Sequence, residues 1–178
     1  MGSRVKEVVL EVIRNRRSTR SFSSEVPDRS VLEQILLAAT WAPSAGNLQP
    51  WFFIMVQSSD LKQRLSQAAL GQDFVADAPF VIVVCADILR SASRYGKRGA
   101  ELYCIQDTAA ATQNMLLTAH GLGLSSCWVG AFNEDEVREV LNLPDEIRPV
   151  ALVPLGFSER RPSAPLRRPI GDVVSWLA

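Results

Sequence analysis

The chain has 178 residues, 47% of them hydrophobic and 21% charged, a composition that excludes disordered and fibrous proteins and predicts one well-buried core. Nineteen basic residues balance nineteen acidic ones, so no net charge favours nucleic acid as a partner. No apolar run approaches the ~20 residues of a membrane-spanning helix, and no signal-peptide pattern is evident. We therefore expect a single domain over residues 1–178, in a cytoplasmic protein that binds neither nucleic acid nor a membrane.

The first half of the chain predicts three helices and one strand. An amphipathic helix at the N-terminus has one apolar face, formed by Val5, Val8, Val9, Val12 and Ile13. A second helix begins after Asp28 as N-cap and ends before Pro43. Its buried stripe comprises Val31, Leu32, Ile35, Leu36 and Ala39. The aromatic and β-branched run 51–56 predicts an inner strand, and residues 60–70 a third helix.

The middle of the chain predicts a second buried strand at 80–85. Residues 91–99 are polar and contain glycine, so we interpret them as a mobile loop over a site. Residues 101–121 sustain a helical pattern with few charges, which indicates a central helix buried on most sides.

The last third predicts a short strand at 127–129, then a helix opened by a capping box at 133–136. Residues 150–155 predict a further strand, in which Pro154 indicates an edge or a bulge. The tail 158–169 is rich in Arg and Pro and is not helical. Strands separated by helices predict an α/β or α+β layered domain, and the absence of G-x-G-x-x-G and of a P-loop motif argues against a Rossmann site or an NTPase.

The cysteines and the histidine do not indicate a metal centre. Cys85, Cys104 and Cys127 are odd in number and widely spaced, with no C-x-x-C pair, which argues against a disulfide framework and a zinc site and fits a reducing compartment. His120 is the only histidine and lies in a helical pattern. We interpret it as a packed or surface residue rather than a catalytic base, and we expect no metal.

Three polar clusters lie in predicted loops, and each has an ordinary structural interpretation beside a ligand-binding one. The basic residues of 16–20 follow the first helix, where cations complement the helix dipole. The segment 43–51, Pro-Ser-Ala-Gly-Asn-Leu-Gln-Pro-Trp, is either a simple helix-to-strand turn or a set of amides suited to ring edges. The pairs Arg160-Arg161 and Arg167-Arg168 form either a solvated tail or, together with the N-terminal arginines, a phosphate site.

Taken in order, these segments resemble the nitroreductase (flavin reductase-like) family in a short form. The motifs are RRSTRSF, APSAGNLQPWFF, GLGLSSCWVGAF, PLGF and LRRPI, together with a long helix that carries Gln106, Asp107, Gln113 and Asn114. The resemblance spans nearly the whole chain, and its most specific elements are Arg-x-Ser-x-Arg and PSAGNLQPW.

The resemblance implies an α+β nitroreductase-like fold, with a central, mostly antiparallel sheet flanked by helices, in an intertwined homodimer with FMN in two clefts between subunits. The residues that match FMN-binding positions are Arg16, Arg17, Ser18, Arg20, Pro43, Ser44, Ala45, Asn47, Val129, Gly130, Arg167 and Arg168. Of these, Arg16, Ser18 and one of the two tail arginines would hold the phosphate and ribityl chain, and Arg20 the pyrimidine edge. The loop at 43–47 would reach over from the partner subunit, and Val129 and Gly130 would lie beside flavin N5.

The implied activity is hydride transfer from NADH or NADPH, through FMN, to a small electron-poor molecule such as a nitro compound or quinone, by a ping-pong mechanism. No side chain acts as an obligatory acid or base, because the cofactor supplies the chemistry. The alternatives are a flavin enzyme for one metabolite, by dehalogenation, dehydrogenation or FMN turnover, and a non-enzymatic flavin-binding protein. The candidates for the wall of the substrate pocket are Gln72, Phe74 and the 91–99 segment.

Overall fold

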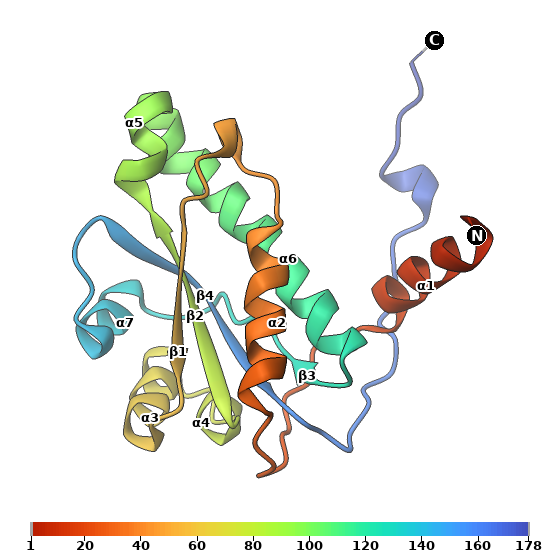
Figure 1. Cartoon of the computed structure of the whole chain (residues 1–178), viewed down its shortest axis with the longest axis horizontal. Coiled ribbons are helices and arrows are strands. Elements are labelled where there is room, and N and C mark those ends of the chain that lie inside the picture. The colour runs from red at the N-terminus through yellow and green to blue at the C-terminus, as the bar shows by residue number, and fades with distance from the viewer. Residues whose placement is uncertain (1, 178) are drawn as a thin grey trace.

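The computed structural model describes the backbone of residues 2–177 and the side chains of residues 7–177 (Figure 1). Its centre is a four-stranded antiparallel sheet in the order β1-β2-β4-β3. The strands are β1 (Trp51–Val56), β2 (Phe80–Asp87), β3 (Ser125–Ser126) and β4 (Ile147–Gly156). The expected α+β class with an antiparallel sheet is therefore confirmed.

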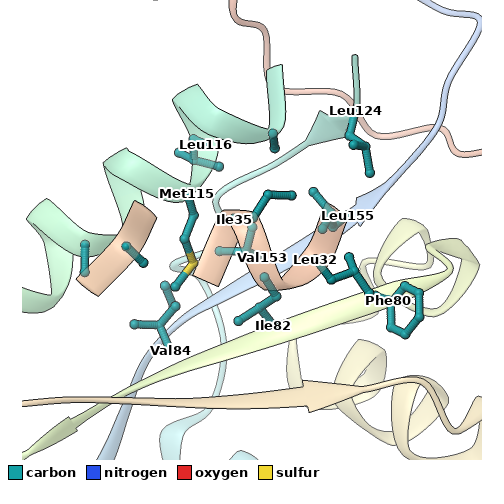
Figure 2. Packing of buried hydrophobic residues seen from close by; sticks show 14 of the residues in the cluster. Leu32, Ile35, Phe80, Ile82, Val84, Met115, Leu116, Leu124, Val153 and Leu155 are labelled. Carbon is teal, nitrogen blue, oxygen red and sulfur yellow. The ribbon is translucent and has the colours of Figure 1, made fainter. Parts of the chain in front are cut away.

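Helices cover both faces of the sheet because β2 alternates its side chains between two cores. On one face, Ile82 and Val84 pack with α2 (Arg29–Thr40) and α6 (Cys104–Gly121), as Figure 2 shows. On the other face, Val81 and Val83 pack with the shorter helices. These are α3 (Ser59–Ala68), α4 (Phe74–Asp77) and α7 (Glu134–Leu141). Burial on both faces explains why β2 is a continuous apolar run.

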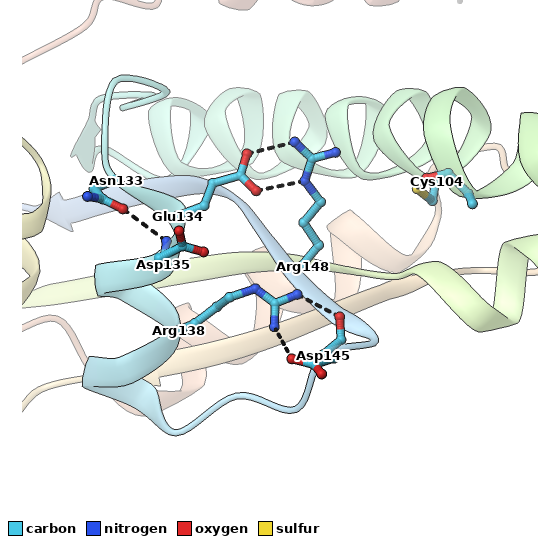
Figure 3. Close-up of polar contacts among 8 residues, drawn as sticks. Cys104, Asn133, Glu134, Asp135, Arg138, Asp145 and Arg148 are labelled. Carbon is cyan, nitrogen blue, oxygen red and sulfur yellow. Dashed lines mark hydrogen bonds and ion pairs between the residues drawn. The ribbon is translucent and has the colours of Figure 1, made fainter.

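Several helical predictions are confirmed. Leu32, Ile35 and Ala39 are the buried stripe of α2, although Asp28 caps it through its backbone carbonyl rather than its side chain. The helix α7 begins at the predicted capping box, where the Asn133 side chain accepts from the Asp135 and Glu136 N–H groups. A bidentate ion pair, the Glu134–Arg148 fork, then joins α7 to β4 (Figure 3).

Strand order differs from the sequence-based expectation. The run 51–56 forms an edge strand, β1, and not an inner one. Conversely β4, with Pro154, lies inside the sheet, and the register irregularity falls between Val84 and Cys85 of β2. The short strand predicted at 127–129 is displaced: β3 occupies 125–126, and Val129 makes only an isolated bridge to Leu152. The apolar content of a segment indicates that it is buried, but it does not indicate which strands lie beside it in the sheet.

The predicted loop at 91–99 is wrong, because this segment is helical. It lies in α5 (Ile88–Arg98), whose first turn is capped by Asp87, and continues into a π-helical turn, η2 (Gly99–Tyr103). A kink inside α5 falls at Gly96, with φ 53° and ψ −139°. Only glycine adopts this region without strain, so the glycine marks a kink within a helix rather than a loop.

The two ends of the chain project from the body on the same side (Figure 1). They are α1 (Gly2–Asn15) and the segment after Phe157, which is irregular except for the short turn η3 (Ile170–Asp172). Large apolar side chains are exposed on both, namely Val8, Val9, Leu10, Ile13, Leu166, Ile170, Val173, Val174, Trp176 and Leu177. Among the described helices, none is long and apolar enough to cross a membrane.

Candidate functional site

The basic segment after α1 is anchored to the sheet. The helix ends where the Arg16 N–H bonds to the Val12 carbonyl, and Ser18 then forms a bridge with Ser126 of β3. The buried Thr19 donates its N–H to the Ser126 carbonyl at 3.0 Å. This backbone pairing fixes the direction in which the arginines on either side of Ser18 project.

Arginine side chains from both ends of the chain approach one another at this segment. Burial lowers the pKa of Arg16, and the nearby charges of Arg167 and Arg17 lower it further, whereas Cys127 acts in the opposite direction. Within the described part of the chain, the buried Nη1 atom of Arg16 has no hydrogen-bond partner. A buried cationic donor without an acceptor is costly unless it meets an anion.

The other arginines of the segment and tail have separate partners. Arg17 donates from Nη1 to the carbonyls of Arg14, at 2.5 Å, and Arg16, at 2.9 Å, and so caps the end of α1. In the tail, Arg168 donates to the Asp172 carbonyl at 2.8 Å, which leaves Arg167 as the tail arginine that acts on Arg16.

A cavity of about 600 Å³ opens beside Arg16. Its polar lining comes from α1, the end of α6, β3 and the tail, and includes Arg17, His120, Ser126, Arg160 and Arg161. Burial, and then the neighbouring arginines, lower the pKa of His120, which favours its neutral form in this cavity.

A second group of side chains lies beside Gly130. Arg20 is placed over the Phe74 ring, 5.8 Å from its centroid. Gln72 donates from Nε2 to the carbonyls of Ala69, at 2.8 Å, and Ala131, at 3.0 Å, which holds the segment after Gly130 in place. The two side chains proposed for a substrate wall from sequence, Gln72 and Phe74, therefore adjoin predicted site residues.

The backbone groups of Val129 and Gly130 differ in whether they are already hydrogen-bonded. Both the N–H and the carbonyl of Val129 are used by Leu152, at 2.9 and 3.0 Å. In the described chain the N–H of the exposed Gly130 has no backbone acceptor. Of the two residues expected beside flavin N5, only Gly130 has an N–H free to donate to a ligand.

The thiol and metal-ligating residues form no site among the residues that the structure describes. The three cysteines are free and buried, and burial raises the pKa of each thiol, for Cys85 to about 12. No three His, Cys, Asp or Glu side chains of the described chain gather as a metal site requires.

The 43–49 loop holds an unusual conformation at the N-terminal end of β1. Its short turn η1 (Ala45–Asn47) is followed by Gln49, and positive φ angles occur at Gly46, Asn47 and Gln49. Asp107 of α6 accepts the Ala45 N–H, and Ser44 Oγ accepts the Gln49 N–H at 3.0 Å. Sequence reasoning gave Asp107 no role, although an acid in a nearly uncharged helix was a signal of a specific partner.

The register of the sheet separates this loop from the arginine segment. Trp51, just after the loop, pairs with Ala86 at one end of β2, whereas Ser126, which pairs with Leu155, lies level with Phe80 at the other end. At ~3.4 Å per residue, the eight residues of β2 span roughly 27 Å. Within one chain, therefore, the structure does not bring the loop residues together with Arg16, Ser18 and Arg20.

Comparison with known proteins decides the family. The model of the nitroreductase family matches residues 13–72 and 68–157. The chain belongs to the nitroreductase family. This nitroreductase-family chain is 38% identical over 155 residues to an Archaeoglobus fulgidus protein named as a candidate NADH dehydrogenase/NAD(P)H nitroreductase, covering 85% of this chain and 86% of that protein.

Two further relatives carry FMN in their names. The FMN reductase (NADPH) of Bacillus subtilis is 30% identical, with 88% of this chain and 70% of that protein covered. The NADPH:FMN oxidoreductase of Vibrio harveyi, solved in complex with NAD⁺, superposes with a TM-score of 0.86 at 27% identity, over 94% of this chain and 76% of that chain.

The residues of this chain fit FMN as a cofactor. The orphaned Nη1 of Arg16 supplies a buried cationic donor for a phosphate, and Arg17, Arg160 and Arg161 line the cavity beside it. The N–H of Gly130 is free to donate to a ring edge.

Proposed function

We propose that this chain is an NAD(P)H-dependent FMN oxidoreductase that reduces a small electron-poor acceptor, such as a nitro compound or a quinone. The observation that carries the proposal is a cavity lined by Arg16 and Arg17 from one end of a nitroreductase-family chain and by Arg160 and Arg161 from the other, beside a buried guanidinium nitrogen without a partner. Bound FMN supplies the hydride-transfer chemistry that no side chain of the site can supply.

In this proposal the residues of the chain bind and orient the cofactor. Arg16, Ser18 and Arg167 hold the phosphate and the ribityl chain, because charge-assisted hydrogen bonds suit phosphate oxygens. Arg20 places a cation at the pyrimidine edge, where it stabilises the negative charge of the reduced ring. The Gly130 N–H donates to the ring beside its reacting nitrogen.

The balance of the reaction needs no acidic or basic side chain. NAD(P)H gives up one hydride and is oxidised to NAD(P)⁺, and the acceptor takes up two electrons and two protons, one of them from solvent. A quinone becomes a hydroquinone, and a nitro group becomes a nitroso group with release of water. With FMN bound, the nicotinamide and the acceptor would occupy the same binding site in turn, which would give ping-pong kinetics.

The proposed enzyme is a homodimer in which each site combines two chains. Two observations support this arrangement. The loop carrying Pro43, Ser44, Ala45 and Asn47 lies at the opposite end of β2 from Arg16, so one flavin reaches both only if the loop comes from a second copy. The exposed apolar side chains of α1 and the tail, with Trp176 at 92% and Leu166 at 99% exposure, also need a partner surface.

A reducing compartment suits this enzyme. Its three cysteines are free and buried, and no pair of them is bridged. We therefore place the protein in the cytoplasm, where NADH and NADPH are available as donors.

The test is a spectrum followed by two separate half-reactions. The purified protein should be yellow with FMN absorption that bleaches on anaerobic addition of NADH or NADPH, and stopped-flow mixing with nitro compounds or quinones should restore it. Flavin that neither nicotinamide reduces would instead support an enzyme of one metabolite, acting by dehalogenation or dehydrogenation, or a flavin-binding protein without activity. A colourless protein that does not bind added FMN would contradict the proposal.

A further inference from the structure

A ladder of two arginines and two tyrosines lies at the same end of the sheet as the 43–49 loop. Tyr95 of α5 and Tyr103 of η2 meet edge to face, with ring centroids 5.2 Å apart. Arg94 lies over the Tyr95 ring at 5.6 Å, and Arg98 over the Tyr103 ring at 5.2 Å. Figure 1 shows α5 and the loop, in orange, side by side above the sheet.

The ladder touches the loop directly. A Cβ added to Gly46 would lie 2.6 Å from the Tyr95 hydroxyl and 3.0 Å from Arg94 Nη1, so these two groups rest on the bare glycine. Arg90, one turn earlier on α5, donates from Nε to the Leu48 carbonyl. The face of α5 that carries Arg90 and Arg94 therefore forms a wall against the loop that we assign to the flavin cleft.

Only some of the basic side chains on and beside this wall have a partner within the chain. Lys97 pairs with Glu101 at 3.7 Å, Arg98 donates to Tyr103 Oη at 2.9 Å, and Arg90 is occupied by Leu48. Among the described residues, Arg94 has neither an acidic partner nor a hydrogen-bond acceptor, and the Tyr95 hydroxyl has no partner either. A cation stacked on an aromatic ring and a free hydroxyl thus converge at Gly46.

The backbone around the ladder has the features of a shaped site. The left-handed Gly96 directly follows Tyr95, and the π-helical turn Gly99–Tyr103 ends at Tyr103, whose ring meets that of Tyr95 edge to face. Single π-helical turns within α-helices are frequent at functional sites. Gly99 is also packed so tightly on the Ser91 carbonyl, 2.3 Å from where its Cβ would be, that no larger residue fits.

We propose that Arg94 and Tyr95 select an aromatic acceptor that carries an anionic group, such as a carboxylate. The inference rests on the proposed function, since it assigns a substrate class to the same flavin cleft. The guanidinium and hydroxyl bind the anion, and the neighbouring rings pack against the aromatic part of the acceptor. Arg94 thus determines specificity, while electrons and protons move as in the general reaction: a nitroaromatic carboxylate gives the nitroso carboxylate and water as NAD(P)H is oxidised.

The experiment compares 4-nitrobenzoate with the uncharged 4-nitrobenzamide as acceptors for FMN-loaded protein. In Arg94→Gln, reoxidation of the reduced enzyme by 4-nitrobenzoate should slow about tenfold or more, because a charge-assisted contact is lost, whereas reoxidation by 4-nitrobenzamide should change less than about twofold. Arg94→Lys should recover part of the loss. The matched control is Arg64→Gln, an exposed arginine on α3 at the other end of the sheet, which should alter neither reaction.

Separate measurements distinguish failure of this inference from failure of the proposed function. FMN content and the rate of flavin reduction by NADH and NADPH are recorded for every variant, and rates are compared per bound flavin. Protein without reducible FMN fails the proposed function itself. Normal reduction with equal losses for both acceptors, with no loss for either, or with an Arg94 effect confined to the nicotinamide reaction overturns the assignment of Arg94 to the acceptor.

Discussion

Asp107 accepts the Ala45 N–H with both of its carboxylate oxygens, at 3.1 and 3.2 Å, across 62 residues of chain. Asp107 is 7% exposed, and burial raises the pKa of its carboxyl whereas the bond from Ala45 lowers it. The loop that we place over the partner's flavin therefore depends on a buried carboxylate beneath it.

Removing this carboxylate should loosen the loop and weaken cofactor binding. In Asp107→Ala the half-buried Ala45 N–H loses its acceptor, at a cost of about 1–2 kcal/mol, so FMN affinity should fall roughly 5- to 30-fold. Asp107→Asn retains one acceptor oxygen without the cost of a buried charge and should bind FMN nearly as the parent does. Fluorescence titration of FMN measures both, and Glu139→Ala, an exposed acid on α7, is the control. Equal affinity in all variants would contradict the role.

Arg16 should be a main contributor to the affinity for FMN. Arg16→Ala removes the buried donor that we assign to the phosphate and should weaken FMN binding by about 1–3 kcal/mol, or roughly 5- to 150-fold. Riboflavin, which lacks the phosphate, should bind the parent and the variant with similar affinity. A loss of the same size for riboflavin would assign Arg16 a structural role instead.

Arg20 should set the reduction potential of the flavin rather than its affinity alone. Arg20→Ala removes a cation from the edge where charge develops, and should lower the two-electron potential by about 20–40 mV, equivalent to roughly 1–2 kcal/mol. Arg20→Lys should stay close to the parent. Spectroelectrochemical titration gives the value, and an unchanged potential in the alanine variant would refute the role.

The Glu134–Arg148 fork predicts a pH-dependent contribution to stability (Figure 3). The hydrogen bond from Arg148 lowers the pKa of Glu134 below its usual 4.5, so its stabilisation is present above that value and is lost as pH falls through the depressed pKa. Because both side chains are about 40% exposed, Glu134→Gln should cost only about 0.5–1 kcal/mol at pH 7. Denaturant melts should show this difference disappearing at strongly acidic pH. A constant difference would contradict the linkage.

The cysteines should be dispensable for turnover. Cys85→Ser, Cys104→Ser and Cys127→Ser each replace a buried, protonated thiol, and FMN-loaded variants should keep hydride-transfer rates near those of the parent. Stopped-flow reduction measures this rate independently of folding yield. A well-folded, FMN-loaded variant with no hydride transfer would reveal a thiol step.

Local patterns in the sequence were sufficient for most of the helices. Apolar spacing and caps predict α2, α3, α6 and α7 because these signals act within one or two turns. The places of β1 and β4 in the sheet depend on pairing between segments far apart in sequence, which no local pattern records. Residues 91–99 are misjudged because polarity and a glycine also occur in an exposed helix that breaks at a left-handed residue.

The candidate site divides in the same way. The arginine segment and the loop are recognisable from their motifs, but Asp107 and Arg94 are not, because their partners, Ala45 and Gly46, lie more than 40 residues away. Likewise the sequence alone does not distinguish Val129 from Gly130 as the residue whose N–H is free to bind a ligand. Only the bridge between Val129 and Leu152 shows that one of the two N–H groups is already engaged.

In the proposed homodimer, the placement of the loop and the arginine segment at opposite ends of β2 has a genetic consequence. A chain damaged at Arg16 and a chain damaged at Asn47 would each bind FMN poorly, and so lose activity, when paired with itself. Mixed dimers would assemble one doubly damaged cleft and one wholly intact cleft, because the sound arginine of the second chain meets the sound loop of the first. Co-expression of the two impaired chains should therefore restore activity at one of the two clefts of each mixed dimer.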